Sequence, residues 1–153
     1  MSASARQTIA FITGFLAIGY ILNFIWEYLQ CVPFFLHGEG SPTIAAMFLA
    51  SLGDILMMCL VYLVVTIFKK SLDCFLLDWN FKMLLLIAIS SITIAVLVEV
   101  IAMKASRWSY TDRNPIIPWL GVSILPVLQM LFINLLTFYI SKRIVSHSFE
   151  VSI

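Results

Sequence analysis

The stretch Gln7–Trp26, QTIAFITGFLAIGYILNFIW, contains no charged side chain over 20 consecutive positions. At a rise of ~1.5 Å per residue, a helix of about 20 residues crosses the ~30 Å hydrocarbon layer of a bilayer. A cleaved signal peptide has a shorter apolar core, of about 7–15 residues, followed by a small-residue cleavage site. This stretch instead continues directly into Glu27. We therefore predict a retained membrane span over residues 8–31.

The composition of the whole chain agrees with a membrane protein. Its 153 residues are 62% hydrophobic and 11% charged, with a mean hydropathy of +1.05. A soluble domain carries about 25% charged residues, so this chain has too few charges to cover a water-facing surface, which excludes a soluble enzyme. The net charge is +1 and the nine Lys and Arg residues are dispersed, so we expect no nucleic-acid partner.

Three further apolar stretches predict spans over residues 44–68, 83–103 and 118–141. Each is followed by basic residues, which are Lys69 and Lys70, Lys104, and Lys142 and Arg143. The sequence thus predicts an all-α, polytopic membrane protein that forms a four-transmembrane-helix bundle, with a single membrane domain over 1–153.

The segments between the spans read as loops. Residues 33–42 contain several Gly and Pro residues, which break both helices and strands. Residues 104–118 combine basic, aromatic and proline residues, a mixture that suits the headgroup interface.

The basic residues also predict an orientation. Six of them lie on the side of the two termini. The other three lie on the opposite side and are Lys104, Arg107 and Arg113. Because Lys and Arg are enriched in cytoplasmic loops, we expect both termini in the cytoplasm and the 32–43 and 104–118 loops outside. Short loops suit a bacterial inner (cytoplasmic) membrane, which we take as the expected location.

Three carboxylates fall inside the predicted spans: Glu27, Asp54 and Glu99. An ionised side chain at the bilayer centre costs ~2.5–3.5 kcal/mol on insertion scales, so such residues face the bundle interior, form pairs or titrate. Glu27 and Glu99 lie near the outer ends of their spans, and Asp54 lies ten residues, or ~15 Å, inside the second span. These three residues are the candidate catalytic groups.

Uncharged polar residues accompany the acids. Asn23, Glu27 and Gln30 are spaced i, i+4, i+7 and share one helix face. Gln129 follows Pro126 by one turn, and Pro126 is expected to leave a backbone carbonyl free at mid-membrane. Gly53 is expected to allow close approach of a neighbouring backbone. Each span thus contributes a polar group to one pocket in the outer half of the membrane.

The predicted pocket residues, besides the three acids, are polar or aromatic: Asn23, Trp26, Gln30, Trp108, Tyr110 and Gln129. Each also has a structural interpretation. Amide side chains hold small bundles together by interhelical hydrogen bonds, at about 0.6 kcal/mol each. Glu27 and Glu99 would then pair with Lys104, Arg107 or Arg113, and the aromatic residues would anchor the protein at the interface rather than shield a cation.

The three cysteines share no compartment, and the chain has no CxxC or paired-histidine spacing. We therefore predict no cofactor and no metal site.

An ordered set of motifs resembles an uncharacterised family of small four-span bacterial membrane proteins. It comprises Asn23-x-x-Trp26-Glu27-x-x-Gln30, Gly53-Asp54, Glu99, Arg107-Trp108-x-Tyr110, Pro115-x-x-Pro118, Gly121 and Pro126-x-x-Gln129. The resemblance implies an integral membrane location with four spans.

Trp26-Glu27 with Asp54 is also similar, over a few residues, to membrane-embedded isoprenoid cyclases of the lycopene and meroterpenoid types. The resemblance implies two acids acting on a protonatable polyene. Where the lycopene-cyclase pattern has a proline followed by paired acids, this chain has Pro126-Val127-Leu128-Gln129.

Three functions follow as hypotheses for this multi-pass protein with a one-sided carboxylate pocket. In the first, the polar cluster supports homo- or hetero-oligomeric assembly, which predicts closed, satisfied contacts. In the second, the protein is an acid–base enzyme acting on a lipid-soluble, isoprenoid-type molecule, which predicts a pocket accessible to lipid with Glu27 and Asp54 close together. In the third, it is a proton-linked transporter acting as an oligomer, which requires a polar path through the inner half.

Overall fold

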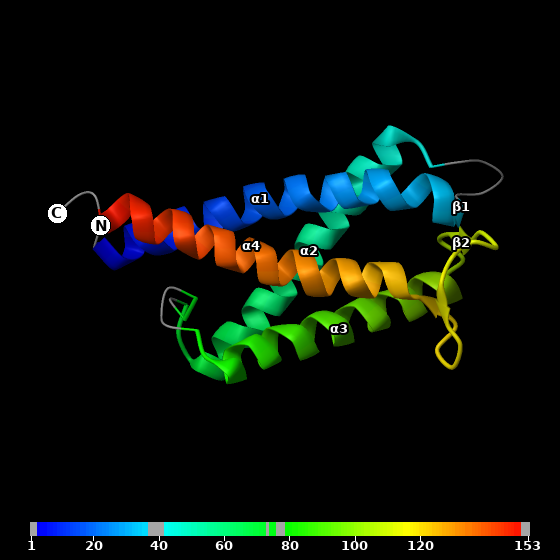
Figure 1. Ribbon diagram of the computed structural model, residues 1–153. Helices are drawn as coiled ribbons and strands as arrows, with labels where there is room; N and C mark the ends of the chain where they lie inside the picture. The colour runs from blue at the N-terminus through cyan, green and yellow to red at the C-terminus, as the bar shows by residue number, and fades with distance from the viewer. Residues whose placement is uncertain (1–2, 37–41, 73, 76–78, 151–153) are drawn as a thin grey trace.

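The fold is an all-α four-helix bundle, as the sequence predicts (Figure 1). The computed structural model describes residues 3–36, 42–72, 74–75 and 79–150. Its helices are α1 (Ala3–Phe34), α2 (Ile44–Lys69), α3 (Phe81–Lys104) and α4 (Ile124–Glu150). Within the described residues, four helices are long and apolar enough to cross a membrane, which indicates an integral membrane protein.

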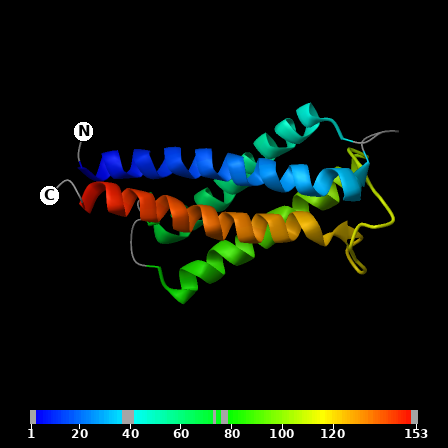
Figure 2. The same cartoon turned by 45° about the horizontal axis from the view of Figure 1, so that its top comes forward.

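The helices are not arranged as a regular square. α1 and α4 lie side by side and antiparallel, and both chain termini lie at the same end (Figures 1 and 2). We call this end proximal and the opposite end distal. α1 packs mainly on α2 and α4, α3 packs mainly on α4 and α2, and α2 barely touches α4. α2 runs obliquely to the other helices, so its distal end lies apart from the distal end of α3 (Figure 1).

The predicted ends of α2 and α3 agree with the structure to within two residues. The Thr43 hydroxyl caps α2 by accepting from the Ala46 amide at 3.2 Å, and the Asn80 side chain caps α3 by accepting from the Met83 amide at 3.0 Å. α2 ends at Lys69 and is capped by Lys70, whose φ of 53° is left-handed. α1 extends three residues beyond its predicted end, through Pro33 in its last turn.

The predicted fourth span, 118–141, is wrong at its start. Residues 116–123 form a tight hairpin in which β3 (Ile116–Ile117) pairs with β4 (Val122–Ser123). The turn passes through Gly121, whose φ of +66° is the left-handed region that glycine adopts without strain. α4 begins only at Ile124, after the hairpin.

The end of the fourth span also differs from the prediction, because Lys142 and Arg143 do not end the helix. Arg143 lies 5.4 Å from the ring centroid of Tyr139, and α4 continues to Glu150.

The loop prediction for 33–42 and 104–118 needs a similar correction, because β1 (Phe35–Leu36) pairs with β2 (Ser109–Tyr110). The centre of the first loop, residues 37–41, lies outside the described residues. The pair fixes the distal end of α1: Thr111 Oγ1 donates to the Pro33 carbonyl, and Asn114 Nδ2 to the Phe34 carbonyl, both at 2.9 Å. These bonds satisfy carbonyls that the end of α1 would otherwise leave without partners.

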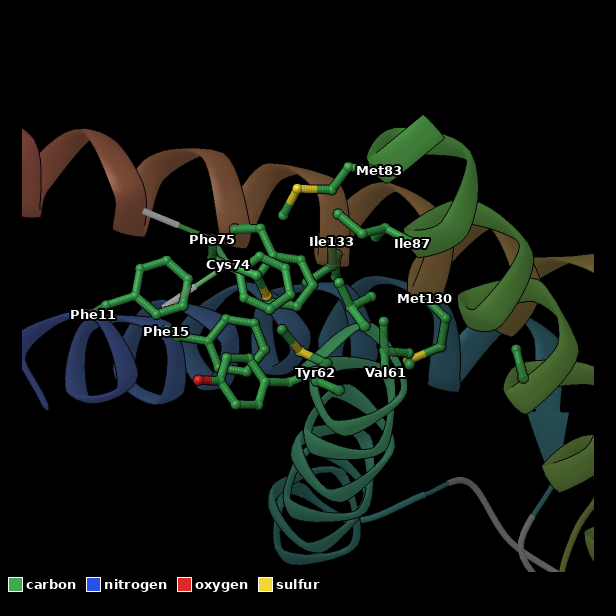
Figure 3. Packing of buried hydrophobic residues seen from close by; sticks show 14 of the residues in the cluster. Phe11, Phe15, Val61, Tyr62, Cys74, Phe75, Met83, Ile87, Met130 and Ile133 are labelled. Atoms are coloured by element: carbon green, nitrogen blue, oxygen red, sulfur yellow. The ribbon is translucent and has the colours of Figure 1, made fainter. Parts of the chain in front are cut away.

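Stacked aromatic rings fill the proximal half of the bundle (Figure 3). Phe11 and Phe15 of α1, Tyr62 of α2, Phe138 of α4 and Phe75 of the α2–α3 connector pack together. The rings of Phe75 and Phe138 are nearly parallel, with centroids 4.2 Å apart. We call these five residues the aromatic cluster. The three acids within the spans, Glu27, Asp54 and Glu99, lie in the distal half, whereas the proximal half also buries small polar side chains such as Thr137 and Ser141.

Candidate functional site

A cavity of about 430 Å³ lies in the distal half, against all four helices. Six of the nine predicted site residues line it: Glu27, Gln30, Asp54, Glu99, Trp108 and Gln129. The other three lie directly behind this wall, and each is hydrogen-bonded to a lining residue: Asn23 to Gln129, Trp26 to Gln30 and Tyr110 to Glu99. The structure thus brings all nine predicted residues to one site.

Gln129 of α4 connects the site across three helices. Its Nε2 donates to Asp54 Oδ2 of α2 at 2.8 Å and to Asn23 Oδ1 of α1 at 3.0 Å. Its Oε1 accepts from Gln30 Nε2 at 2.8 Å. The side chain is only 1% exposed, so these contacts use both of its N–H donors away from solvent.

Glu27 is held by its own helix. Its Oε1 accepts from Gln30 Nε2 at 2.6 Å, and its Oε2 accepts from the Cys31 thiol at 2.9 Å. Gln30 in turn accepts from the Trp26 indole N–H at 2.8 Å. Both oxygens of Glu27 are therefore occupied, and two amide side chains, Gln30 and Gln129, link this acid to Asp54.

Asp54 differs from Glu27 because only one of its oxygens is hydrogen-bonded. Oδ2 accepts from Gln129, whereas Oδ1 accepts no hydrogen bond from any residue that the structure describes. Oδ1 is not fully enclosed by protein atoms, and Asp54 lines the cavity while being 7% exposed. The free oxygen of this buried acid is thus accessible from the cavity.

Glu99 is anchored by the distal hairpins. Its Oε2 accepts from the Tyr110 hydroxyl at 2.5 Å, and that hydroxyl accepts from the Ser123 backbone N–H at 3.2 Å. Trp108 interacts with both Glu99 and Tyr110. Partial burial, followed by the hydrogen bond to Glu99, raises the pKa of the Tyr110 hydroxyl, so it stays a donor at neutral pH.

The ion pairs of the structural interpretation are not found among the residues that the structure describes. Within the described residues, Glu27 and Glu99 pair with the amide, thiol and phenol groups above and not with Lys104, Arg107 or Arg113. The basic residues follow the end of α3, in the exposed distal segment, and only Arg107 reaches the cavity wall.

Two structural roles predicted for glycine and proline are also wrong. A Cβ on Gly53 would meet nothing within 4 Å, because this residue borders the cavity. Gly19 is the glycine at a close contact, since its Cβ would lie 2.8 Å from Met58 Cε. Pro126 lies in the first turn of α4, where the N–H of any residue lacks a helical partner, so it frees no carbonyl at mid-helix.

Sequence reasoning missed several members of the site. Cys31 lines the cavity and donates to Glu27, and its position at i+4 from that acid was the available signal. Met58 Sδ accepts from Asn23 Nδ2 at 3.0 Å, and only the packing of α1 on α2 reveals that contact. Ala46 and Ala50 line the cavity on α2 at the same i, i+4, i+7 spacing that ends at Gly53.

The remaining walls are mainly aliphatic and aromatic, so the site combines a largely apolar cavity with three acids. Both oxygens of Glu27 accept hydrogen bonds, Glu99 accepts one from Tyr110 at Oε2, and Asp54 has an open Oδ1. No protein-family model, curated protein or solved structure matches this chain, and its function is therefore argued from this site.

Proposed function

We propose that the protein is a membrane-embedded acid–base catalyst that isomerises or cyclises a lipid-soluble, isoprenoid-type molecule. In this proposal the distal half is the outer half of a bacterial inner membrane. The single observation that carries it is the open Oδ1 of Asp54 in a largely apolar cavity, with two further carboxylates in the same walls. An acid buried beside an apolar substrate can protonate a carbon–carbon double bond without competition from water.

The contacts give each acid a separate role. Asp54 transfers a proton from Oδ1 to one carbon of the double bond, which forms a C–H bond and leaves a carbocation and the Asp54 carboxylate. Gln129 holds Oδ2 and fixes the direction of Oδ1. Glu99 of α3 lines the same cavity and accepts a proton from a neighbouring carbon, so that a new double bond forms. Water then takes the proton from Glu99 and returns one to Asp54, which restores both groups and exchanges the transferable proton with solvent. The overall reaction is redox-neutral and needs no other co-reactant.

Glu27 and the aromatic residues stabilise the cation in this scheme. Both Glu27 oxygens are occupied by donors, so this residue supplies negative charge rather than a transferable proton. The Trp108 ring lines the cavity and can face a carbocation, to which aromatic faces are attracted.

The structure supports this proposal over transport. A proton-linked transporter needs a polar route through both halves of the membrane, but the proximal half holds the stacked rings of the aromatic cluster. The assembly hypothesis has partial support, because Gln129, Gln30 and Asn23 are fully engaged. These bonds are made within one chain, so the network does not require a second subunit.

Deuterium uptake tests the proposal without knowledge of the natural substrate. The purified protein in nanodiscs is incubated in D₂O with acyclic isoprenoids, namely farnesol, geranylgeraniol and squalene, and the lipids are examined by mass spectrometry. We expect deuterium at carbon in at least one probe, and loss of uptake in Asp54→Asn. The control is Asp112→Asn, which changes an exposed loop acid and should leave uptake intact.

The outcomes separate chemistry from structure. Loss of uptake in Asp54→Asn with an unchanged circular dichroism spectrum supports proton transfer by Asp54. Absence of uptake by the wild-type protein with all three probes, or uptake that is unchanged in Asp54→Asn, would overturn the proposal.

A further inference from the structure

We propose, resting on the function proposed above, that the substrate enters the cavity sideways from the bilayer, between the distal parts of α2 and α3. The substrate is an acyclic apolar chain without a large polar headgroup. The chain would pass Gly53 and reach Asp54 without crossing the aqueous surface. The position of the cavity, the side chains around it and the cover at its distal end support this route independently.

The α2 wall of the cavity has room for such a chain. Ala46, Ala50 and Gly53 line it at a spacing of four and three residues, which places them on one helix face. A Cβ on Gly53 would meet nothing within 4 Å, so the space beside this glycine is open. A chain lying along this face therefore encounters hardly any side-chain bulk before Asp54, which is one residue further on.

The flanks of this wall are apolar. Leu49 of α2 lines the cavity and is 66% exposed, and the α3 side of the wall includes Ala95 and Val98. The oblique course of α2 separates it from α3 at this level (Figure 1). The side chains at this opening are therefore those that contact acyl chains in a membrane.

The other approaches are covered. At the distal end, Phe35 lines the cavity and packs edge-on against Tyr110, with ring centroids 5.6 Å apart. Tyr110 is in turn bonded to Glu99 and to the Ser123 backbone. α1 and α4 form the back of the cavity through Glu27, Gln30 and Gln129. Among the described residues, Arg107 is the exposed charged side chain in the lining, and the apolar opening is the side between α2 and α3.

This route restricts the substrate class. Asp54 lies ten residues, or ~15 Å, along α2 from Ile44, at the depth of acyl chains rather than headgroups. A molecule with a large polar headgroup would have to carry it into hydrocarbon, which is costly. An acyclic apolar chain, such as an isoprenoid, meets no such cost.

Spin labelling tests the route directly. A nitroxide is attached at Gly53→Cys in a chain whose own cysteines, Cys31, Cys59 and Cys74, are replaced by serine, and the protein is reconstituted in liposomes. Collision with oxygen, which concentrates in lipid, is compared with collision with a water-soluble nickel chelate. Labels at Leu56→Cys, on the exposed face of α2, and Asp112→Cys, in the distal loop, provide lipid and water references.

We expect the label at position 53 to match the Leu56 label, with high oxygen and low nickel accessibility. A label that matches the Asp112 reference would overturn the lateral route and assign an aqueous entrance. This readout does not depend on turnover. A water-like label with deuterium uptake intact would reject the route alone, and a lipid-like label without uptake would reject the chemistry alone.

A blocking variant provides the second readout. Gly53→Phe fills the opening without a backbone clash, since nothing lies within 4 Å of the added Cβ. We expect loss of deuterium uptake from Gly53→Phe and full uptake by Leu56→Phe, which adds the same ring to the exposed face. Equal uptake by both variants would contradict entry past Gly53.

Discussion

Gln129 shows how one amide side chain can organise a site across three helices. It offers two N–H donors and an acceptor oxygen, and all three have partners: Asp54, Asn23 and Gln30. A leucine of similar size would leave these three groups without their partner in an apolar environment. At about 0.6 kcal/mol for each interhelical hydrogen bond, the loss is about 2 kcal/mol.

We therefore predict that Gln129→Leu lowers the free energy of unfolding by about 2 kcal/mol. The measurement is unfolding in mixed detergent micelles, followed by circular dichroism. Thr93→Leu is the matched control, since Thr93 is exposed on α3 and its replacement should leave stability unchanged. Equal stability of the two variants would show that the network contributes nothing to the fold.

Tyr110 gives a prediction about pH. Burial and the bond to Glu99 raise its pKa in the folded protein above the ordinary value of about 10. The stabilisation by its hydroxyl is therefore fully present below about pH 10 and is lost as the pH rises through the folded-state value.

We predict that Tyr110→Phe is less stable than wild type by about 1–3 kcal/mol at neutral pH. The difference should shrink above about pH 10, because the tyrosine of the unfolded chain then ionises while the folded hydroxyl still holds its proton, and it is lost once the pH passes the raised folded-state pKa. Thermal unfolding of both proteins across this range checks the prediction. A difference that grows with pH would contradict the assigned donor.

Much of the site could be predicted at the residue scale. The i, i+4, i+7 spacing of Asn23, Glu27 and Gln30 places them on one face, and the cost of buried polar groups indicates that Asp54 and Gln129 face them. The sequence alone could not tell which donor meets which oxygen. It also left ion pairs open for Glu27 and Glu99, because position along the chain does not reveal that these acids bind amide, thiol and phenol groups instead.

At the scale of elements, the crossing of α1 and α2 depends on Gly19. A Cβ there would lie 2.8 Å from Met58 Cε and 3.2 Å from Ile55 Cδ1, both on α2. Met58 also accepts from Asn23, so displacing it disturbs the polar network. A larger side chain at this position overpacks the crossing.

We predict that Gly19→Leu lowers the free energy of unfolding by about 1–3 kcal/mol. Gly53→Leu is the matched control, since it makes the same replacement where a Cβ meets nothing within 4 Å. Unfolding of both variants in detergent provides the comparison. If Gly53→Leu were the less stable of the two, the assignment of crossing and cavity to these glycines would be reversed.

Helix boundaries show where sequence patterns succeed and fail. Basic residues marked the C-terminal ends of α2 and α3, and the caps Thr43 and Asn80 at their starts emerge from the structure. The start of α4 was misplaced because hydropathy is continuous through Trp119 and Leu120, whereas the hairpin at this point depends on the local turn at Gly121. Hydropathy measures burial in lipid and is insensitive to a turn of a few residues.

At the scale of the whole molecule, both termini lie at the proximal end, which follows from an even number of spans (Figure 2). The positions of Lys69, Lys70, Lys142 and Arg143 at that end predict that it faces the cytoplasm. Arg107 and Arg113 oppose this bias at the distal end.

We predict that green fluorescent protein is fluorescent when fused to either terminus, because it folds in the cytoplasm. Alkaline phosphatase, which is active only outside, should be active when fused after Asp112. The same pair of reporters on a Lys69→Gln, Lys70→Gln variant tests the cause, because removing these charges should reduce the orientation bias. Phosphatase activity at the termini of the wild-type protein would reverse the assigned orientation.

The number of helices and their order across the membrane could be predicted from hydropathy alone. The oblique course of α2 could not, because it results from packing at Gly19 at one level and around the aromatic cluster at another. Phe75 illustrates the limit, since a residue from a connector that reads as polar forms part of the proximal core.

The position of Gln129 on the last helix has a consequence for biogenesis. The ribosome makes Asn23 and Asp54 first, and the amide that binds both follows only when α4 is synthesised. During that interval the first three helices hold Asp54 and Asn23 without their later partner. Completion of the chain is thus also the step that satisfies these two polar groups, so a prematurely terminated product differs from a finished one by polar groups that a membrane quality-control system can detect.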